Sequence, residues 1–400
     1  MALTLDGTNG IVSSGSITTQ SATGVIFSDS SNLPAASSPF VLKNRIINGD
    51  MRIDQRNAGA SVTITDTAAL TYTIDRWAGY GSAASKFSIQ QNAAAVTPPV
   101  GFNNYLGATS LSAYSVGASE VYKVTQVIEG YNVADLAWGT ANAKTVTLSF
   151  WVRSSLTGTF GGALNNSAFN RNYPFTYTIS VANTWEYKSI TVAGDTSGTW
   201  LTTNGIGVQI VWSLGTGATY SGTAGAWAAG NIQSATGATS VVGTNGATFY
   251  ITGVQLEIGS TATPFERIMH SQKIQLCQRY FYKTFSQSTA VANDTSYTGG
   301  IGVPGGIAFQ TGAMRNFTIF PQPMRTTPTV TYYNTDITTP RTNNVWLVFF
   351  GGGTGWTTAT ATTSGEVSEL YVEPNIDKSG SFTIGYSYLM SGFLTASAEL

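Results

Sequence analysis

The sequence predicts an all-β protein: a jelly-roll β-sandwich followed by a smaller C-terminal β-sandwich, with an extended N-terminal segment and one short linking helix. Short segments rich in β-branched and aromatic residues recur along the 400 residues, and Gly, Asn and Ser clusters bound most of them. Charged residues make up only 10% of the chain, while Gly reaches 44. Hydroxyl and amide side chains therefore take the place of charge as the hydrogen-bonding groups.

Composition also excludes several classes of function. The 19 Lys and Arg are dispersed and the net charge is −1, so no basic patch for nucleic acid is expected. One His and one Cys permit neither an intrachain disulfide nor a Cys/His zinc site. We expect no cofactor, and the composition leaves open whether a structural metal ion is bound.

Residues 1–43 form the extended N-terminal segment. They are dominated by Ser, Thr, Gly and Ala, and short apolar groups alternate with turn signals. This apolar surface is too small for the segment to fold alone. The segment is therefore either a flexible tail or a strip that becomes ordered against a partner or against other copies.

Residues 44–262 are predicted to form the jelly roll. Nine strands are expected, at 62–65, 72–80, 86–90, 121–128, 144–153, 175–181, 186–192, 205–214 and 247–258. Alternation within 144–153 places Val146, Leu148, Phe150 and Val152 on one face. The stretch 215–246 is a long insertion rich in Gly, Ala, Ser and Thr, and loops of this length are usually functional or disordered.

Residues 263–283 are predicted to form the linking helix. Thr263 is placed as the cap, Pro264 at the first helical position and Glu266 at the third, the pattern of a capping box. Residues 284–400 return to strand character at 316–320, 329–333, 345–350, 367–372 and 381–389. They are predicted to form the C-terminal β tip domain.

Neither a basic segment followed by an apolar run nor an apolar stretch of 18 residues is present in the sequence. We therefore expect synthesis in a cytoplasm without a signal peptide, and no membrane insertion. His270 is interpreted as a surface residue and Cys277 as a packed thiol, and no pair of carboxylates has a spacing that indicates catalysis. We expect the protein not to be an enzyme.

Sugar binding requires aromatic faces that stack on a pyranose ring and amides or hydroxyls that bind its hydroxyl groups. The chain has 9 Trp and 19 Tyr, many of them beside Asn, Thr or Gly. Aromatics and amides next to turns in the C-terminal domain are the candidate glycan-binding residues: Tyr332, Tyr333, Asn343, Asn344, Trp346 and Trp356. Tyr220 and Trp227, in the long insertion, are secondary candidates; packing roles are the alternative for each residue.

Several motifs together resemble bacteriophage tail fibre and receptor-binding proteins with a carbohydrate-binding-module-like jelly roll. Residues 44–56 read NRIINGDMRIDQR, 144–153 read KTVTLSFWVR, and 249–259 read FYITGVQLEIG, followed by ATPFER at 262–267. The stretches LCQRYF at 276–281, MRTTPT at 324–329 and LTASAEL at 394–400 are similar to the same fibres. The resemblance covers residues 44–283 well and the C-terminal domain more loosely.

The resemblance implies a homotrimeric fibre located on the virion. Residues 1–43 would attach it to a tail or head protein and support trimerisation, and the C-terminal domain would face a host cell-surface polysaccharide. The motifs around Gln255–Glu257 and Phe265–Arg267 are interpreted as architectural. Two alternatives remain open: a purely structural fibre or capsid-decoration subunit with no glycan site, and a glycan depolymerase.

Overall fold

The computed structural model describes residues 25–26, 32–33, 42–293, 306–335, 343–349, 356–362, 366–378 and 382–400. The chain divides into two compact units, 1–42 and 43–400. Most of the predicted N-terminal segment lies outside the described residues. Within it, β1 (Val25–Ile26) pairs antiparallel with β2 (Asn32–Leu33).

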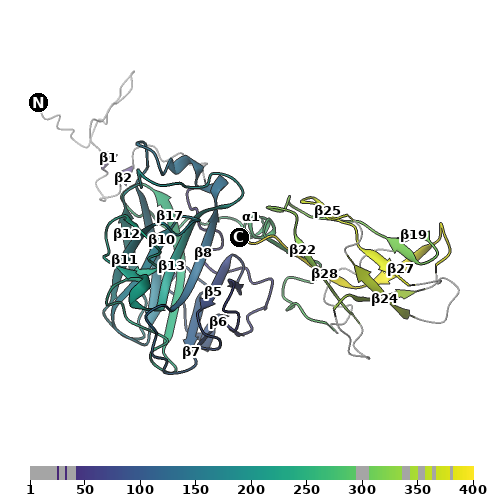
Figure 1. Cartoon of the computed structure of the whole chain (residues 1–400), viewed down its shortest axis with the longest axis horizontal. Coiled ribbons are helices and arrows are strands. Elements are labelled where there is room, and N and C mark those ends of the chain that lie inside the picture. Colours follow the sequence, from purple (N-terminus) through teal and green to yellow (C-terminus); the bar gives the residue numbers. More distant parts are fainter. Residues whose placement is uncertain are drawn as a thin grey trace, which may run out of the picture. The chain divides into compact units, whose positions relative to one another are not determined.

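A jelly-roll sandwich of two antiparallel sheets forms the first part of the larger unit, as predicted (Figure 1). The seven-stranded sheet has the order β15 (Ala228–Ala229), β11 (Arg171–Ile179), β10 (Gly158–Asn165), β13 (Ile206–Thr216), β8 (Val121–Glu129), β5 (Trp77–Gly81) and β4 (Thr71–Tyr72). The six-stranded sheet has the order β12 (Glu186–Val192), β9 (Val146–Ser154), β17 (Thr248–Ile258), β7 (Leu106–Ser110), β6 (Phe87–Gln91) and β3 (Val62–Thr63).

The facing sides of the two sheets form the core. Val146, Leu148, Phe150 and Val152 of β9 are all fully buried there, which confirms the predicted alternation. The ring of Trp212 from β13 lies 5.8 Å from that of Phe150, across the space between the sheets. The opposite side of the seven-stranded sheet is therefore free to present other side chains.

Residues 44–56 form a loop packed against β17. Asn44 donates from Nδ2 to the Val254 carbonyl (3.1 Å), and its Oδ1 accepts from the Leu256 N–H (3.1 Å). A Cβ at Gly49 would lie 2.1 Å from the Val254 carbonyl oxygen, so only glycine fits. Asn44 and Gly49 of this motif are therefore packing requirements.

The segment after β17 folds back onto that strand through buried polar side chains. The Glu257 carboxylate accepts from the N–H and hydroxyl of Thr263 (2.8 and 2.6 Å). Gln255 Oε1 accepts from the Glu266 N–H (2.7 Å), and the Glu266 carboxylate accepts from the Asn44 N–H (2.9 Å). These residues are architectural, as the sequence indicates.

The predicted helix start at Thr263 is wrong, because Thr263 and Glu266 are committed to these contacts and lie outside any helix. Helix α1 spans His270–Gln278, and Gln272 Oε1 accepts from the Met269 N–H (3.3 Å) at its start. Cys277 is fully buried on it, as expected of a packed thiol, and burial raises the pKa of that thiol well above its ordinary value.

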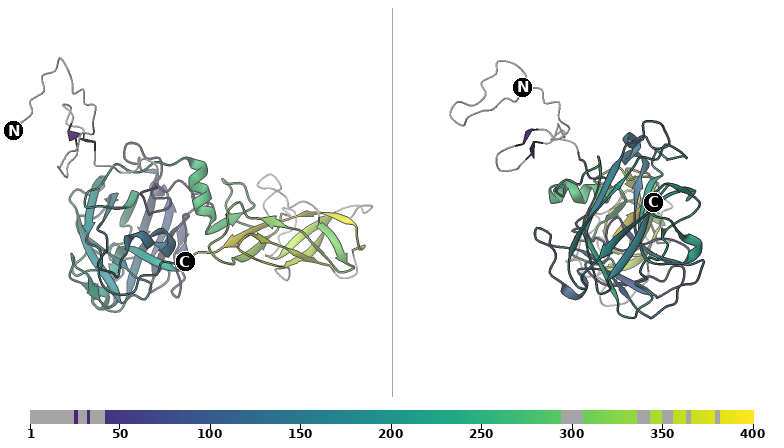
Figure 2. Two further views of the ribbon diagram at one scale, coloured as in Figure 1. Left: turned by 90° about the horizontal axis from the view of Figure 1, so that it is seen from above. Right: turned by 90° about the vertical axis from the view of Figure 1, so that its left-hand side faces the viewer.

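Beyond the helix, the C-terminal part contains a closed barrel in place of the predicted second sandwich (Figure 2). Its antiparallel strands follow the order β19 (Gly306–Gln310), β20 (Ala313–Arg315), β26 (Asn375–Asp377), β24 (Trp356–Thr362), β23 (Val345–Phe349) and β27 (Ser387–Ser391). A three-stranded sheet of β18 (Phe281–Lys283), β28 (Phe393–Ser397) and β22 (Thr329–Tyr333) accompanies it. The remaining pairs are β14 (Ser221–Gly222) with β16 (Ser234–Ala235), and β21 (Thr318–Ile319) with β25 (Tyr371–Val372).

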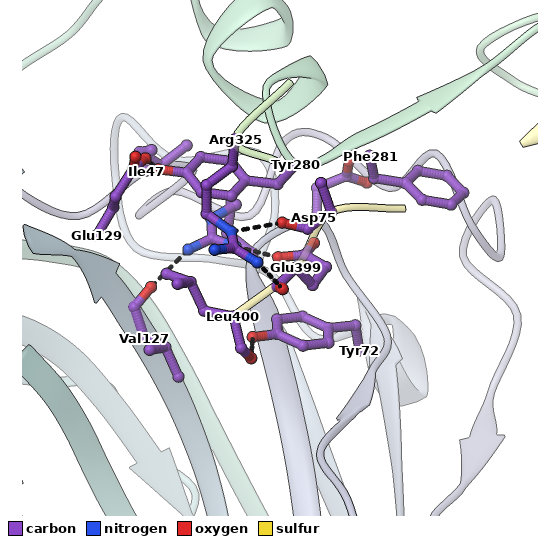
Figure 3. Close-up of polar contacts among 12 residues, drawn as sticks. Ile47, Tyr72, Asp75, Val127, Glu129, Tyr280, Phe281, Arg325, Glu399 and Leu400 are labelled. Atoms are coloured by element: carbon purple, nitrogen blue, oxygen red, sulfur yellow. Dashed lines mark hydrogen bonds and ion pairs between the residues drawn. The ribbon is translucent and has the colours of Figure 1, made fainter. Parts of the chain in front are cut away.

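The last residues of the chain bind the sandwich through a partly buried group of charges, which we call the C-terminal ion cluster: Arg56, Arg76, Glu129, Arg279, Arg325 and Glu399. Glu399 pairs with Arg56 (2.7 Å) and with Arg76. Figure 3 shows Tyr72 and Tyr280 on opposite sides of Glu399 and Leu400. The Arg76 guanidinium stacks 3.5 Å from the centre of the Tyr280 ring, and Tyr72 donates to the Leu400 carbonyl (2.7 Å).

Two further contacts complete the cluster. Arg279 forms a bidentate pair with Glu129 (2.6 and 2.9 Å), which also accepts from the Tyr280 hydroxyl (2.6 Å). Arg325 donates to the carbonyls of Ala398 and Glu399 (2.7 Å each). The motifs around residues 44–56, 276–281, 324–329 and 394–400 therefore meet at one place and serve the scaffold.

No helix within the described residues is long and apolar enough to span a membrane.

Candidate functional site

A groove with a volume of about 440 Å³ lies on the outer side of the seven-stranded sheet, where the long insertion crosses it. It is lined by Ala68, Ala69, Leu70, Tyr80, Ser82, Ser119, Val121, Lys123, Phe169, Ile206, Gln209, Tyr220, Asn231 and Gln233. Three of these residues carry aromatic rings, three carry amides and one carries a charge. The groove is therefore apolar with a few placed polar groups, as in ordinary small-ligand sites.

Each aromatic ring reaches the groove from a different element. Tyr80 lies on β5 beside Lys123 of β8, and Tyr220 ends the short turn Ala218–Tyr220 in the insertion. Phe169 lies in the turn between β10 and β11 with φ +52°, a conformation that is strained for a bulky side chain. Asn166 holds this turn, because its Oδ1 accepts from the N–H groups of Asn170 (3.1 Å) and Arg171 (3.2 Å).

The amides of the sheet include acceptors without partners. Gln209 on β13 is 3% exposed, and its Oε1 accepts no hydrogen bond from any residue that the structure describes. Asn165 and Asn172, on the neighbouring strands β10 and β11, continue the same row and also carry unpaired amide oxygens. Buried polar atoms are normally paired, and of these three residues only Gln209 lines the groove, so its oxygen marks a place where a ligand or water is expected to bind.

Lys123 is the only charged residue of the groove lining, all of which lies in the described range. It is 6% exposed, and its Nζ donates to Gln233 Oε1 at 3.0 Å. Burial lowers the pKa of its ammonium from 10.5 to about 8.

The two secondary candidates in the insertion, Tyr220 and Trp227, have different environments in the structure. Tyr220 lies in the groove lining. Trp227 instead packs edge-on against Trp138, Trp200 and Tyr173, with ring centres 5.2–5.3 Å away, and its indole N–H donates to the Ala193 carbonyl (2.6 Å). Its ring is occupied by these contacts, so Trp227 is a packing residue.

Two of the C-terminal candidates must be corrected. Tyr332 and Trp346 are 1% and 0% exposed, and their rings pack edge-to-face at 5.5 Å in the C-terminal core. The strand register of β22 and β23 turns both side chains inward. A buried ring offers no face to a sugar, so neither residue can stack on one.

The other C-terminal candidates do not form one site. Tyr333 is half-buried against Phe285, with ring centres 5.5 Å apart. Asn343 and Asn344 are exposed just before β23, whereas Trp356, 42% exposed, begins β24 opposite Phe349 at the far end of β23. The two ends of this five-residue strand lie about 13 Å apart.

Sequence reasoning missed most of the groove: Tyr80, Lys123, Phe169, Gln209 and Gln233. The one available signal was Lys123, a lone charge in the middle of the strand at 121–128. A lysine on the outer side of a sheet is ordinarily solvated. The residue becomes notable only because the insertion covers that side.

A second hollow of about 450 Å³ lies against the other sheet, with Trp151, Tyr187 and Phe265 in its lining. Its one charged residue, Arg267, stacks over the rings of Phe102 and Phe265. A third hollow contains His270 and Asp54, but the Asp54 carboxylate accepts from the N–H groups of Asn57 and Gly59. Among the described residues, no three His, Cys, Asp or Glu side chains lie close enough to hold a metal ion.

No family model matches the chain, and no curated protein matches it. Among solved structures, the chain is similar to the enzymatically active domain of tailspike protein 4 of bacteriophage CBA120, with 11% identity over 54% of this chain and 21% of that one, at a TM-score of 0.28. It is also similar to a family 11 carbohydrate-binding module of Clostridium thermocellum in complex with a β-1,3-1,4-mixed-linked tetrasaccharide, with 9% identity over 51% and 98% of the two chains and a TM-score of 0.25. A CBM4 structure matches with 15% identity over 53% and 98%, at a TM-score of 0.26.

The chain spans about a fifth of the tailspike's length. The strand pairing described above establishes the fold of the sandwich.

Proposed function

We propose that this protein binds glycans in the groove over the seven-stranded sheet and does not cleave them. The observation that carries the proposal is the combination of three rings with the unpaired Gln209 oxygen in one groove. Ring faces stack on the C–H face of a sugar, and an amide oxygen accepts from its hydroxyl groups. No residue of the groove lining is a carboxylate, whereas glycoside hydrolysis ordinarily uses two of them.

Phe169→Gly is the variant that tests this proposal. Glycine adopts φ +52° without strain, so the change removes the ring and is expected to leave stability unchanged or improved. We expect binding of the full chain to glycans on an array to weaken at least tenfold, about 1.4 kcal/mol. The measurement is the affinity for each oligosaccharide that the parent protein binds.

Tyr187→Ala is the matched control, because it removes an exposed ring from the other sheet. It should leave binding unchanged. Loss of binding in Trp356→Ala but not in Phe169→Gly would move the site to the C-terminal domain. If the parent protein binds no glycan at all, the proposal is wrong and a purely structural role is favoured. Release of reducing ends from a glycan would instead establish a depolymerase.

We further propose that the chain forms a homotrimeric fibre on a bacteriophage virion, attached through residues 1–43. The motif resemblance supports the fibre role, and an apolar row on the outside of the barrel supports association. Leu389 of β27, 58% exposed, pairs with Phe349 of β23, which pairs with Trp356 of β24. Contiguous apolar patches of this kind commonly mark protein interfaces.

Light scattering tests the assembly. We expect a mass of about 126 kDa, three times the 42.1 kDa chain, at micromolar concentration. Leu389→Glu places a charge in the apolar row and should reduce the mass to that of one chain. Leu111→Glu, at an exposed leucine of the sandwich, is the control and should leave the trimer intact. A parent protein that stays monomeric contradicts the trimer.

A further inference from the structure

The ammonium of Lys123 is enclosed in the groove without a counter-ion. In the described residues no carboxylate lies within ion-pair distance of it, and the rings of Tyr80 and Phe169 lie 5.5 Å from its Nζ. An ammonium has three N–H donors. Gln233 accepts from one of them, and Gln233 is itself held by a hydrogen bond from its Nε2 to Asn231 Oδ1.

The other two buried lysines among the described residues have more or stronger partners than Lys123, although burial lowers the pKa of Lys283 to about 8 as well. Lys273 forms an ion pair with Asp50. Lys283 donates to the carbonyls of Gln287 (3.2 Å) and Thr289 (2.7 Å). A buried cation ordinarily has such partners, because removing it from water is unfavourable.

The groove also offers separate groups for the carboxylate and for the hydroxyl groups of an acidic sugar. Lys123 supplies N–H donors and positive charge, whereas the unpaired Oε1 of Gln209 supplies an acceptor for a hydroxyl group. The rings of Phe169 and Tyr220 line the same groove and can contact a pyranose face. A sugar acid has a pyranose ring, hydroxyl groups and a carboxylate within one residue. A small inorganic anion would not contact the aromatic rings of the groove.

We propose that Lys123 receives the carboxylate of a sugar acid, so that the groove selects glycans containing uronic acids over neutral ones. This inference rests on the glycan-binding function proposed above and names its ligand class. The contact is a charge-assisted hydrogen bond inside a largely desolvated site, where such bonds are strong.

The proposal predicts a pH dependence. Tyr80 from β5 and Phe169 lie over the Lys123 ammonium, Gln233 from the insertion accepts from it, and Ser213 is its neighbour on β13. Tyr220 from the insertion lines the same groove, so Tyr80 and Tyr220 are the titratable groups near Lys123. With the pKa of the free Lys123 at about 8, about nine in ten side chains are protonated at pH 7 and about one in ten at pH 9. A uronate stays ionised throughout this range, so its affinity should fall about tenfold between pH 7 and pH 9.

The experiment measures binding of the full chain to oligosaccharides of glucuronate, galacturonate or mannuronate, each paired with its carboxyl-reduced form. Reduction keeps the ring and removes the charge. We expect at least one acidic oligosaccharide to bind at least tenfold more tightly than its reduced form. Lys123→Gln should abolish that preference while retaining residual binding, and Lys86→Met, at a lysine over the Tyr114 ring outside the groove, should preserve it.

The outcomes separate the two proposals. Equal affinity for the charged and the reduced oligosaccharides would overturn the role of Lys123 and leave glycan binding intact. A preference for the charged form that persists in Lys123→Gln would have the same meaning. Absence of any binding to acidic and neutral glycans alike overturns both. Competition by millimolar inorganic phosphate, equal to that by glucuronate, would assign Lys123 to a phosphate and refute the carboxylate.

Discussion

Glu399→Gln is expected to lower the free energy of unfolding by about 3–5 kcal/mol. The Glu399 carboxylate is buried between Arg56 and Arg76, and the Arg76 side chain is only 1% exposed. The amide keeps the shape of the side chain but removes the carboxylate that forms an ion pair with both guanidinium groups, of which that of Arg76 is almost fully buried. Urea denaturation followed by tryptophan fluorescence measures the loss.

Glu369→Gln is the matched control, because Glu369 is exposed and undergoes the same chemical change. It should change stability by less than about 0.5 kcal/mol. In a double variant with Arg76→Met, the loss should be smaller than the sum of the two single losses, because one of the unpaired charges is gone. A loss in Glu399→Gln as small as that of the control would show that the C-terminal ion cluster does not hold the chain end.

The C-terminal ion cluster brings together motifs that lie far apart in the sequence. Arg56, Tyr280, Arg325 and Glu399 come from four separate stretches and make contacts within one network. Their spacing along the chain gives no indication of this meeting. The motifs can be recognised in the sequence, but their common role in this ion cluster cannot be predicted from it. Ion pairing between residues far apart in the sequence is determined by the fold.

The sequence predicts strands where large apolar side chains alternate with polar ones. It does not predict a strand that packs closely because its residues are small. Strand β10, Gly158–Asn165, was missed because it reads GTFGGALN. A Cβ at Gly162 would lie 2.4 Å from the Phe175 ring, so this strand contributes to packing by having no side chain there. Such a strand has no hydrophobic pattern to detect.

The candidate site shows the same limit. Tyr220 was found because it lies in an insertion too long to be a simple turn, whereas Trp346 was chosen for its place beside a turn and proved to face inward. Lys123 and Gln209 lie on ordinary strands, and their side chains point away from the core. What makes them a site is the insertion that covers them, and no local pattern in the sequence places that insertion.

Lys123→Met should stabilise the free protein, the reverse of what is expected for a buried core substitution. Holding the ammonium in the groove lowers its pKa from 10.5 to about 8, which corresponds to about 3 kcal/mol of unfavourable burial at pH 7. Methionine fills similar space without charge, but it leaves Gln233 Oε1 without its donor. We therefore expect a net gain of about 1–3 kcal/mol at pH 7 in the free energy of unfolding.

The sign of the pH dependence identifies the cause of that gain. Between about pH 8 and pH 10.5 the unfolded chain keeps the Lys123 proton while the folded protein has lost it, so the parent protein gains stability as the pH rises. The advantage of Lys123→Met should therefore shrink through this window and vanish near its upper end. Comparing the two proteins at each pH cancels the other titrating groups, and Lys86→Met should show no such gain.

A stabilising substitution that also removes the preference for acidic glycans would mean that the chain keeps an unfavourable charge for its ligand. Functional sites commonly retain groups that lower the stability of the fold. An acidic oligosaccharide should then stabilise the parent protein through binding and leave Lys123→Met unaffected. If Lys123→Met instead loses stability at every pH, the ammonium is a structural group that links β8 to the insertion. The proposal that Lys123 binds the carboxylate of a ligand would then be wrong.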